Sequence, residues 1–122
     1  MDNKKIMAII PALNEETTIA AVIEGIRPYA DEVIVIDDAS SDNTIDIATS
    51  LGAIVVLNSE NMGYDKSIER GFKEALKKGA DIVFTFDADG QHSSSDIPFI
   101  LKPILDDEAD LVVEEAVSCQ IF

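Results

Sequence analysis

Ile82-Val83-Phe84-Thr85-Phe86-Asp87-Ala88-Asp89-Gly90 is the stretch that decides the fold of this chain. Its first five residues are β-branched or aromatic, in a run that is short for a helix and typical of a buried strand. The strand ends in Asp87 and Asp89, which lie two positions apart and therefore point to the same side of a continuing strand. Such a carboxylate pair suits Mg²⁺ or Mn²⁺, but an ordinary Asp-rich turn has the same composition. The stretch alone leaves both interpretations open.

Composition describes a single globular domain. The chain has 122 residues, of which 47% are hydrophobic and 27% charged. No apolar run is long enough to cross a bilayer, and the first residues lead into a strand rather than a signal peptide. Cys119 is the single cysteine, which excludes an internal disulfide and a cysteine-rich zinc site. We therefore expect no transmembrane segment in this chain and a cytoplasmic location.

The charge balance is strongly acidic, with 24 acidic against 9 basic residues and a net charge of −15. Such a field repels phosphate backbones, so nucleic acid is not an expected partner. It also disfavours docking of this chain on an anionic membrane surface. Solubility accounts for much of the charge, but acids that follow strand ends also suit a metal site.

Apolar runs and helical periodicities alternate along the whole chain. Strands are predicted at residues 5–10, 32–36, 53–57, 82–86 and 109–113. Helices are predicted at residues 19–26, 43–51 and 96–105, and one more ends at Gly79, with an apolar face made of Ile68, Phe72, Ala75 and Leu76. Asn14 is a candidate cap for the first helix, with Glu15 and Glu16 at its positive end. This alternation predicts an α/β fold, a Rossmann-like three-layer α/β/α arrangement around a mostly parallel sheet.

Polar turns follow three of the predicted strands, at residues 11–15, 37–38 and 87–89. The carboxyl ends of parallel strands meet at one edge of the sheet, so these turns converge although they lie far apart in the sequence. The convergence favours a metal–nucleotide site over a set of unrelated surface turns.

Three segments together resemble family 2 inverting glycosyltransferases of the GT-A fold. They are Ile9-Ile10-Pro11-Ala12-Leu13-Asn14-Glu15-Glu16, Val35-Ile36-Asp37-Asp38-Ala39-Ser40-Ser41-Asp42-Asn43-Thr44 and Asp87-Ala88-Asp89-Gly90-Gln91-His92. The subgroup that they most resemble transfers mannose or glucose to dolichyl or polyprenyl phosphate. The resemblance runs in order from about Lys5 to Val113. It implies that the chain is the nucleotide-binding half of such an enzyme.

The resemblance assigns the nucleoside to the first two strand ends. It places the base and ribose against Pro11, Leu13 and Glu15, where Leu13 stands in place of a frequent aromatic residue. Asp38 is expected to hydrogen-bond the nucleotide, and Ile36 to line the base pocket.

The third strand end is assigned to the metal and the diphosphate. The resemblance makes Asp89 the direct ligand of Mg²⁺ or Mn²⁺ within the Asp87-Ala88-Asp89 motif. Asp87 would contact the ribose or share the metal, and Gln91 would lie near the diphosphate of a GDP- or UDP-linked sugar. The metal would stabilise the charge on the leaving nucleoside diphosphate.

The chain departs from the family pattern after residue 113. Two acids, Glu114 and Glu115, stand where the family has a small residue and an arginine. We expect residues 1–113 to form the nucleotide-sugar-binding domain, truncated relative to the family, and residues 114–122 to be a divergent tail. The missing half would hold the acceptor site and, in many relatives, the catalytic base, so no catalytic residue is assigned. Segment 63–67 also differs from the small, glycine-rich version of the family.

Other functions fit parts of the pattern. A non-catalytic nucleotide and Mg²⁺ binding module needs only the three strand ends, and an exposed sheet edge would favour a homo-oligomer. A phosphoacceptor receiver-like domain would also carry acids at strand ends, but Lys102 follows Asp87 too closely for it. His92, the single histidine, is interpreted as a loop residue.

Overall fold

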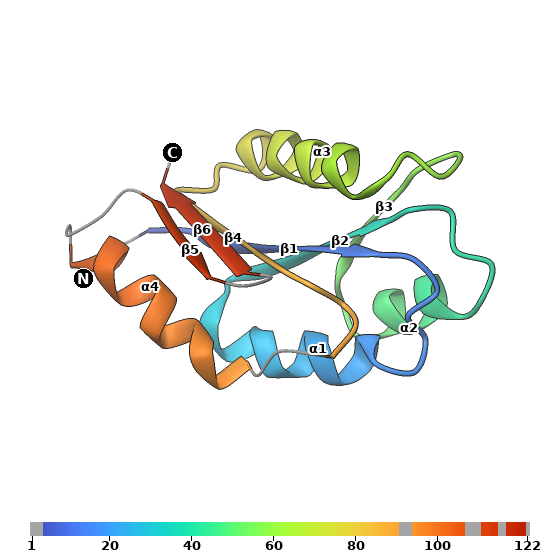
Figure 1. Ribbon diagram of the computed structural model, residues 1–122, viewed down its shortest axis with the longest axis horizontal. Coiled ribbons are helices and arrows are strands. Elements are labelled where there is room, and N and C mark those ends of the chain that lie inside the picture. Colours follow the sequence, from blue (N-terminus) through green and yellow to red (C-terminus); the bar gives the residue numbers. More distant parts are fainter. Residues whose placement is uncertain (1–3, 91–93, 107–110, 115–116, 122) are drawn as a thin grey trace.

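The computed structural model describes residues 4–90, 94–106, 111–114 and 117–121. The strands among these residues form one six-stranded sheet (Figure 1). Along the sheet the strands follow the order β3-β2-β1-β4-β6-β5. Their bounds are β1 Ile6–Ala12, β2 Glu32–Asp37, β3 Ile54–Leu57, β4 Ile82–Phe86, β5 Leu111–Glu114 and β6 Val117–Ile121. The first four strands pair in parallel, whereas β6 runs antiparallel to both β4 and β5. The sheet is therefore mostly parallel, as the sequence predicted.

Helices cover both faces of the sheet. In Figure 1, α3 lies on one face, and α1, α2 and α4 lie on the other. The helices are α1 Ile19–Ile26, α2 Thr44–Ser50, α3 Tyr64–Lys77 and α4 Ile97–Leu105, with the short 3₁₀ helices η1 Arg27–Tyr29 and η2 Ser94–Asp96. The predicted three-layer α/β/α fold is confirmed.

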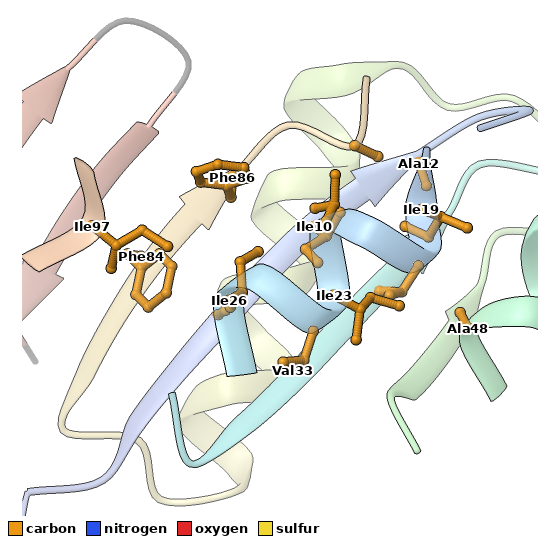
Figure 2. Close-up of a cluster of buried hydrophobic side chains, with 14 of the residues drawn as sticks. Ile10, Ala12, Ile19, Ile23, Ile26, Val33, Ala48, Phe84, Phe86 and Ile97 are labelled. Carbon is orange, nitrogen blue, oxygen red and sulfur yellow. The ribbon is translucent and has the colours of Figure 1, made fainter. Parts of the chain in front are cut away.

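Alternate residues of the central strands feed two separate hydrophobic clusters. Ala8 and Ile10 of β1 belong to the cluster beneath α1, together with Ile23 and Phe84 (Figure 2). Met7, Ile9, Ile34 and Ile36 point the other way and pack below α3. Each fully buried Ile or Phe contributes roughly 1.5–3 kcal/mol to folding. Burial on both faces explains why these strands are continuous apolar runs in the sequence.

The contact of α3 with the sheet depends on Gly71. This residue is buried, and a Cβ atom added to it would lie 2.4 Å from Cγ2 of Ile9. Glycine therefore lets the helix backbone approach β1 closely. Ser67, one turn earlier in α3, is only 1% exposed, so the first turns of the helix are held against the strands.

Two local expectations are wrong. Asn14 does not cap α1, which begins at Ile19, because Asn14 has a left-handed φ of 53° and is part of the preceding loop. Leu76 is not on the buried face of α3 and is 53% exposed, whereas Ala75 is buried and Ile68 and Phe72 pack against the cluster. The helical spacing of Leu76 places it beside the buried stripe rather than in it.

The last part of the chain adds a strand that the sequence analysis did not contain. Within residues 114–122, which we set apart as a divergent tail, Val117–Ile121 form β6 and pair with both β4 and β5. The two end strands of the sheet are consequently β3 and β5, and β4 is not an edge. The domain boundary at residue 113 stays a prediction, as does pairing with another copy through a sheet edge. Across the described ranges, no helix has both the length and the apolar character needed to cross a membrane.

The Gly71 contact can be tested by Gly71→Ala. Overpacking against Ile9 costs about 1–3 kcal/mol, and the better helix propensity of alanine returns only about 0.5–1 kcal/mol. We therefore expect a net loss of stability in urea unfolding. Lys73→Ala is the matched control on the exposed side of α3, where only one solvent-exposed ion pair of 3.5 Å is lost. Equal stability of the two variants would contradict the close approach.

Candidate functional site

A pocket of about 320 Å³ opens at the carboxyl ends of β1, β2 and β4, beside the start of α3. Its walls come from four segments that are far apart in the sequence. The lining residues are Pro11, Ala12, Leu13, Glu15, Asp38, Gly63, Tyr64, Ser67, Asp87, Ala88 and Asp89. The convergence of strand ends that the sequence predicted is therefore present in the fold.

The loop after β1 is fastened to the loop after β2. The backbone N–H of Asn14 donates to Oγ of Ser40 at 2.9 Å, and Oδ1 of Asn14 accepts from the N–H of Ser41 at 2.8 Å. The N–H of Glu15 donates to Oγ1 of Thr44 at 2.9 Å. The polar residues around Asn14 and Ser40 thus join two strand ends, and they hold Leu13 and Glu15 at the pocket.

Asp37 and Asp38 turn to opposite faces of the sheet. Asp37 continues the alternation of β2 toward the α1 side, where it is fully buried, and its Oδ2 accepts the N–H of Ser40 at 2.8 Å. Its Oδ1 has no hydrogen-bond partner among the described residues. Asp38 is 7% exposed and faces the pocket on the α3 side.

Asp38 anchors the loop that leads into α3. Its Oδ1 accepts the N–H of Met62 at 2.7 Å and the side-chain amide of Asn58 at 2.9 Å, and its Oδ2 accepts the N–H of Gly63 at 3.1 Å. Burial raises the pKa of Asp38, but these three donors together outweigh it and hold the pKa below its ordinary value. A carboxylate has about four acceptor positions, so roughly one is left for a ligand.

Tyr64 lies across the pocket from the start of α3 to the end of β4. Its hydroxyl donates to Oδ1 of Asp87 at 3.2 Å. Burial, followed by the negative charge of Asp87, raises the pKa of Tyr64 to about 12. The phenol is therefore protonated at neutral pH and acts as a hydrogen-bond donor to Asp87.

Thr18 holds the turn that carries Asp87 and Asp89. Its hydroxyl donates to the carbonyl oxygen of Ala88 at 2.5 Å. The next glycine, Gly90, has φ +77°, and a Cβ atom added there would lie 3.2 Å from Cγ2 of Thr18. Thr18, which directly precedes α1, therefore supports the acidic turn. Within this turn Ala88 is buried and Asp89 is exposed at the rim of the pocket.

The structure brings most of the predicted residues to this pocket. Seven of them line it, namely Pro11, Leu13, Glu15, Asp38, Asp87, Ala88 and Asp89. Ile36 does not line it, because the alternation of β2 buries this side chain fully in the cluster below α3. Gln91 and His92 lie outside the described residues.

Thr18, Tyr64 and Ser67 contribute to the pocket or to the turn beside it but were not predicted as site residues. Gly63 and Tyr64 follow the polar loop after β3, so the rule that placed the other three strand ends at this edge could also have placed them. Thr18 gave no signal, because its partner Ala88 is 70 positions away.

The carboxylates at the rim fit a metal ion that is shared with a ligand. Among the described residues, no group of three or more His, Cys, Asp or Glu side chains could hold a metal on its own. Mg²⁺ is often held by only one or two carboxylates together with phosphate oxygens. Asp87 and Asp89 match that mode of binding, in which a phosphate group completes the ligand set.

Asp38→Asn tests the anchoring of the loop. The variant places an amide NH₂ against a backbone N–H, so we expect a loss of about 1–2 kcal/mol at pH 7, the scale of hydrogen bonds to a charged group near the surface. Because the folded pKa of Asp38 is lowered, its contribution is complete above the unfolded pKa of about 3.9 and is lost as the pH falls through the folded value. Urea unfolding between pH 7 and pH 3 should therefore show the two proteins converging below about pH 4. Asp46→Asn, which changes an exposed residue of α2, is the control. A difference in unfolding free energy between Asp38→Asn and the unaltered protein that does not change with pH would contradict the anchoring role of Asp38.

Comparisons with known proteins agree with the fold and the pocket. A sequence model described as "Glycosyl transferase family 2" matches residues 7–121. The UDP-N-acetylglucosamine–dolichyl-phosphate N-acetylglucosaminyltransferase of Methanococcus voltae is 36% identical, over 93% of this chain and 52% of its own length. The undecaprenyl-phosphate 4-deoxy-4-formamido-L-arabinose transferase of Serratia proteamaculans is 34% identical, over 81% of this chain and 33% of its own.

Solved structures give the same result. Glucosyl-3-phosphoglycerate synthase of Mycobacterium tuberculosis, in complex with Mn²⁺, UDP and glucosyl-3-phosphoglycerate, is 31% identical with a TM-score of 0.69, covering 84% of this chain and 40% of that one. A further complex of the same enzyme contains Mg²⁺ and UDP. The chain spans about half the length of the first curated relatives, between 47% and 52%. The GT-A resemblance found in the sequence is confirmed, and the chain belongs to glycosyl transferase family 2.

Proposed function

We propose that this chain binds a nucleoside-diphosphate sugar together with Mg²⁺ or Mn²⁺, as the donor-binding half of a transferase that moves the sugar to a polyprenyl-phosphate or glycan acceptor. The observation that carries the proposal is the pocket in which the ends of β1, β2 and β4 meet, with Asp87 and Asp89 among its lining residues. Such an edge is where α/β folds bind nucleotides.

Each end of the pocket suits a different part of the donor. Pro11, Leu13 and Glu15 offer apolar surface and a carboxylate to the base and ribose. The remaining acceptor position of Asp38 suits an N–H group on the base. Ala88 lies between Asp87 and Asp89, and Gln91 follows Asp89 after Gly90, which supports diphosphate binding at this turn.

The metal supplies positive charge that stabilises the nucleoside diphosphate as it leaves. Asp89 would be its direct protein ligand, while Asp87 contacts the ribose or shares the ion. The chain's net charge of −15 makes this neutralisation important, because a diphosphate would otherwise approach an acidic rim.

Relatives support the donor and acceptor classes. UDP accompanies Mn²⁺ in one similar solved structure and Mg²⁺ in another, which favours a UDP-linked over a GDP-linked sugar. The names of the two similar transferases contain dolichyl and undecaprenyl phosphate, which favours a polyprenyl-phosphate acceptor. We assign no catalytic base to this chain. A cytoplasmic location belongs to the proposal and rests on the single cysteine.

Asp89→Ala tests the metal assignment. The variant should lose Mn²⁺-dependent binding of UDP in calorimetric titration, because the direct ligand is removed, while its unfolding curve stays unchanged. Glu24→Ala, which removes one acid from the exposed surface of α1, should bind like the unaltered protein. Undiminished Mn²⁺-dependent affinity in Asp89→Ala would refute this assignment.

Thr18→Val tests whether the turn must be held. The variant keeps the shape of the side chain but leaves the carbonyl of Ala88 without its donor at 2.5 Å. We expect the Mn²⁺ concentration for half-maximal UDP binding to rise by about tenfold, the equivalent of about 1.4 kcal/mol. Thr18→Ser keeps the hydroxyl and should change it little. Identical metal dependence in the two variants would argue against a positioning role for Thr18.

A further inference from the structure

Tyr64 is the one aromatic side chain among the described residues that line the pocket. It is the first residue of α3 and is 53% exposed. A large aromatic ring that stays half open to solvent within a pocket presents apolar surface to a ligand.

Both ends of Tyr64 are fastened. Its backbone follows Met62 and Gly63, whose N–H groups donate to Asp38 at 2.7 and 3.1 Å. Its hydroxyl donates to Oδ1 of Asp87 at 3.2 Å. The ring therefore spans the pocket between the carboxylate at the end of β2 and the first carboxylate after β4. A ring held in this way loses little conformational entropy when a ligand binds.

The direction of the ring matches the order of groups in a nucleoside. A base near Asp38 would lie at the backbone end of Tyr64, and its ribose would then lie near Asp87 at the hydroxyl end. A neutral base is also the part of a nucleotide best suited to a neutral ring beside carboxylates, because a phosphate group would be repelled there. Flat bases stack on aromatic side chains with little dependence on their identity.

We propose that Tyr64 is a base-binding residue, whose ring stacks on the nucleobase and whose bond to Asp87 fixes the ring in place. The proposal rests on the proposed function, since it requires that the pocket binds a nucleotide. It adds a contact from α3 to those of the strand ends. Leu13, which is 41% exposed, supplies only aliphatic surface from the β1 side.

Tyr64→Phe and Tyr64→Leu separate the ring from the hydroxyl. Both variants lose the bond to Asp87, but only Tyr64→Phe keeps an aromatic ring. Calorimetric titration with UDP and Mn²⁺ should give a dissociation constant about tenfold higher for Tyr64→Leu than for Tyr64→Phe, within the range of base–aromatic stacking. Inorganic diphosphate with Mn²⁺ has no base, so the two variants should bind it equally.

The outcomes distinguish this inference from the proposed function. Equal UDP affinity of the two variants, with normal Mn²⁺-dependent binding by the unaltered protein, overturns the role of Tyr64 and leaves the nucleotide site standing. If Tyr64→Leu and Tyr64→Phe differ in affinity by the same factor for diphosphate as for UDP, the role of Tyr64 is also overturned, because the ring would then act on the metal or phosphate region. Failure of the unaltered protein to bind either UDP or GDP overturns both proposals.

Fluorescence offers a second measurement, because the chain has two tyrosines and no tryptophan. In a Tyr29→Phe background, the emission of Tyr64 can be followed alone. Saturation with UDP and Mg²⁺ should quench this emission, whereas inorganic diphosphate and Mg²⁺ should leave it nearly unchanged. Quenching of equal size by both ligands would contradict stacking.

Discussion

The parallel hydrogen bonding of β1 to both β2 and β4 is the constraint on which the candidate site depends. In this register Ala12 pairs with Asp37, and Ile9 pairs with Thr85, so the three strands end at the same edge of the sheet. Burial of alternate residues in two clusters fixes the register, because a slip by one residue would turn every side chain to the wrong face. The apolar strands therefore determine where the acids are placed.

The negative charge of the side chains at this edge of the sheet is the second constraint, because it limits which ligands the pocket can bind. Asp38 is satisfied by three donors from the protein and acts mainly as an anchor, whereas Asp87 is contacted by a neutral phenol. Asp89 is exposed next to it. No Lys or Arg belongs to the lining of the pocket among the described residues. An arrangement of this kind is suited to an anionic ligand only when a cation accompanies it, which connects the fold to the proposed metal dependence.

Features of the fold and the site that depend on residues close together in the sequence could be predicted, whereas features that depend on contacts between distant residues could not. The strand of residues 82–86 and the acids after it could be predicted because apolar burial and strand alternation are local patterns. The seven residues that line the pocket followed from the general geometry of parallel sheets and from the family resemblance. Ile36 was misplaced because it faces the same side of the sheet as Asp38 but lies two positions earlier, in β2, within the core cluster below α3.

Other features depend on contacts between distant segments. Val117, Cys119 and Ile121 alternate with Ser118 and Gln120, which is a strand pattern that was not used in the prediction. The insertion of β6 between β4 and β5 depends on pairing with β4, which is more than 30 residues away in the sequence. Asn14 resembled a helix cap, but it forms hydrogen bonds with Ser40 and Ser41 in the loop after β2. Tyr64 and Thr18 act through Asp87 and Ala88, which are remote in sequence. Short-range patterns cannot reveal such pairs.

The most direct test of the account is a calorimetric titration of the unaltered protein with UDP and with GDP, each with and without Mn²⁺. We expect saturable binding of UDP that requires Mn²⁺, and weaker binding of GDP. Binding of UDP with the same affinity in the presence and absence of Mn²⁺, or no binding of either nucleotide, would contradict the claim that these strand ends form a metal-dependent nucleotide site.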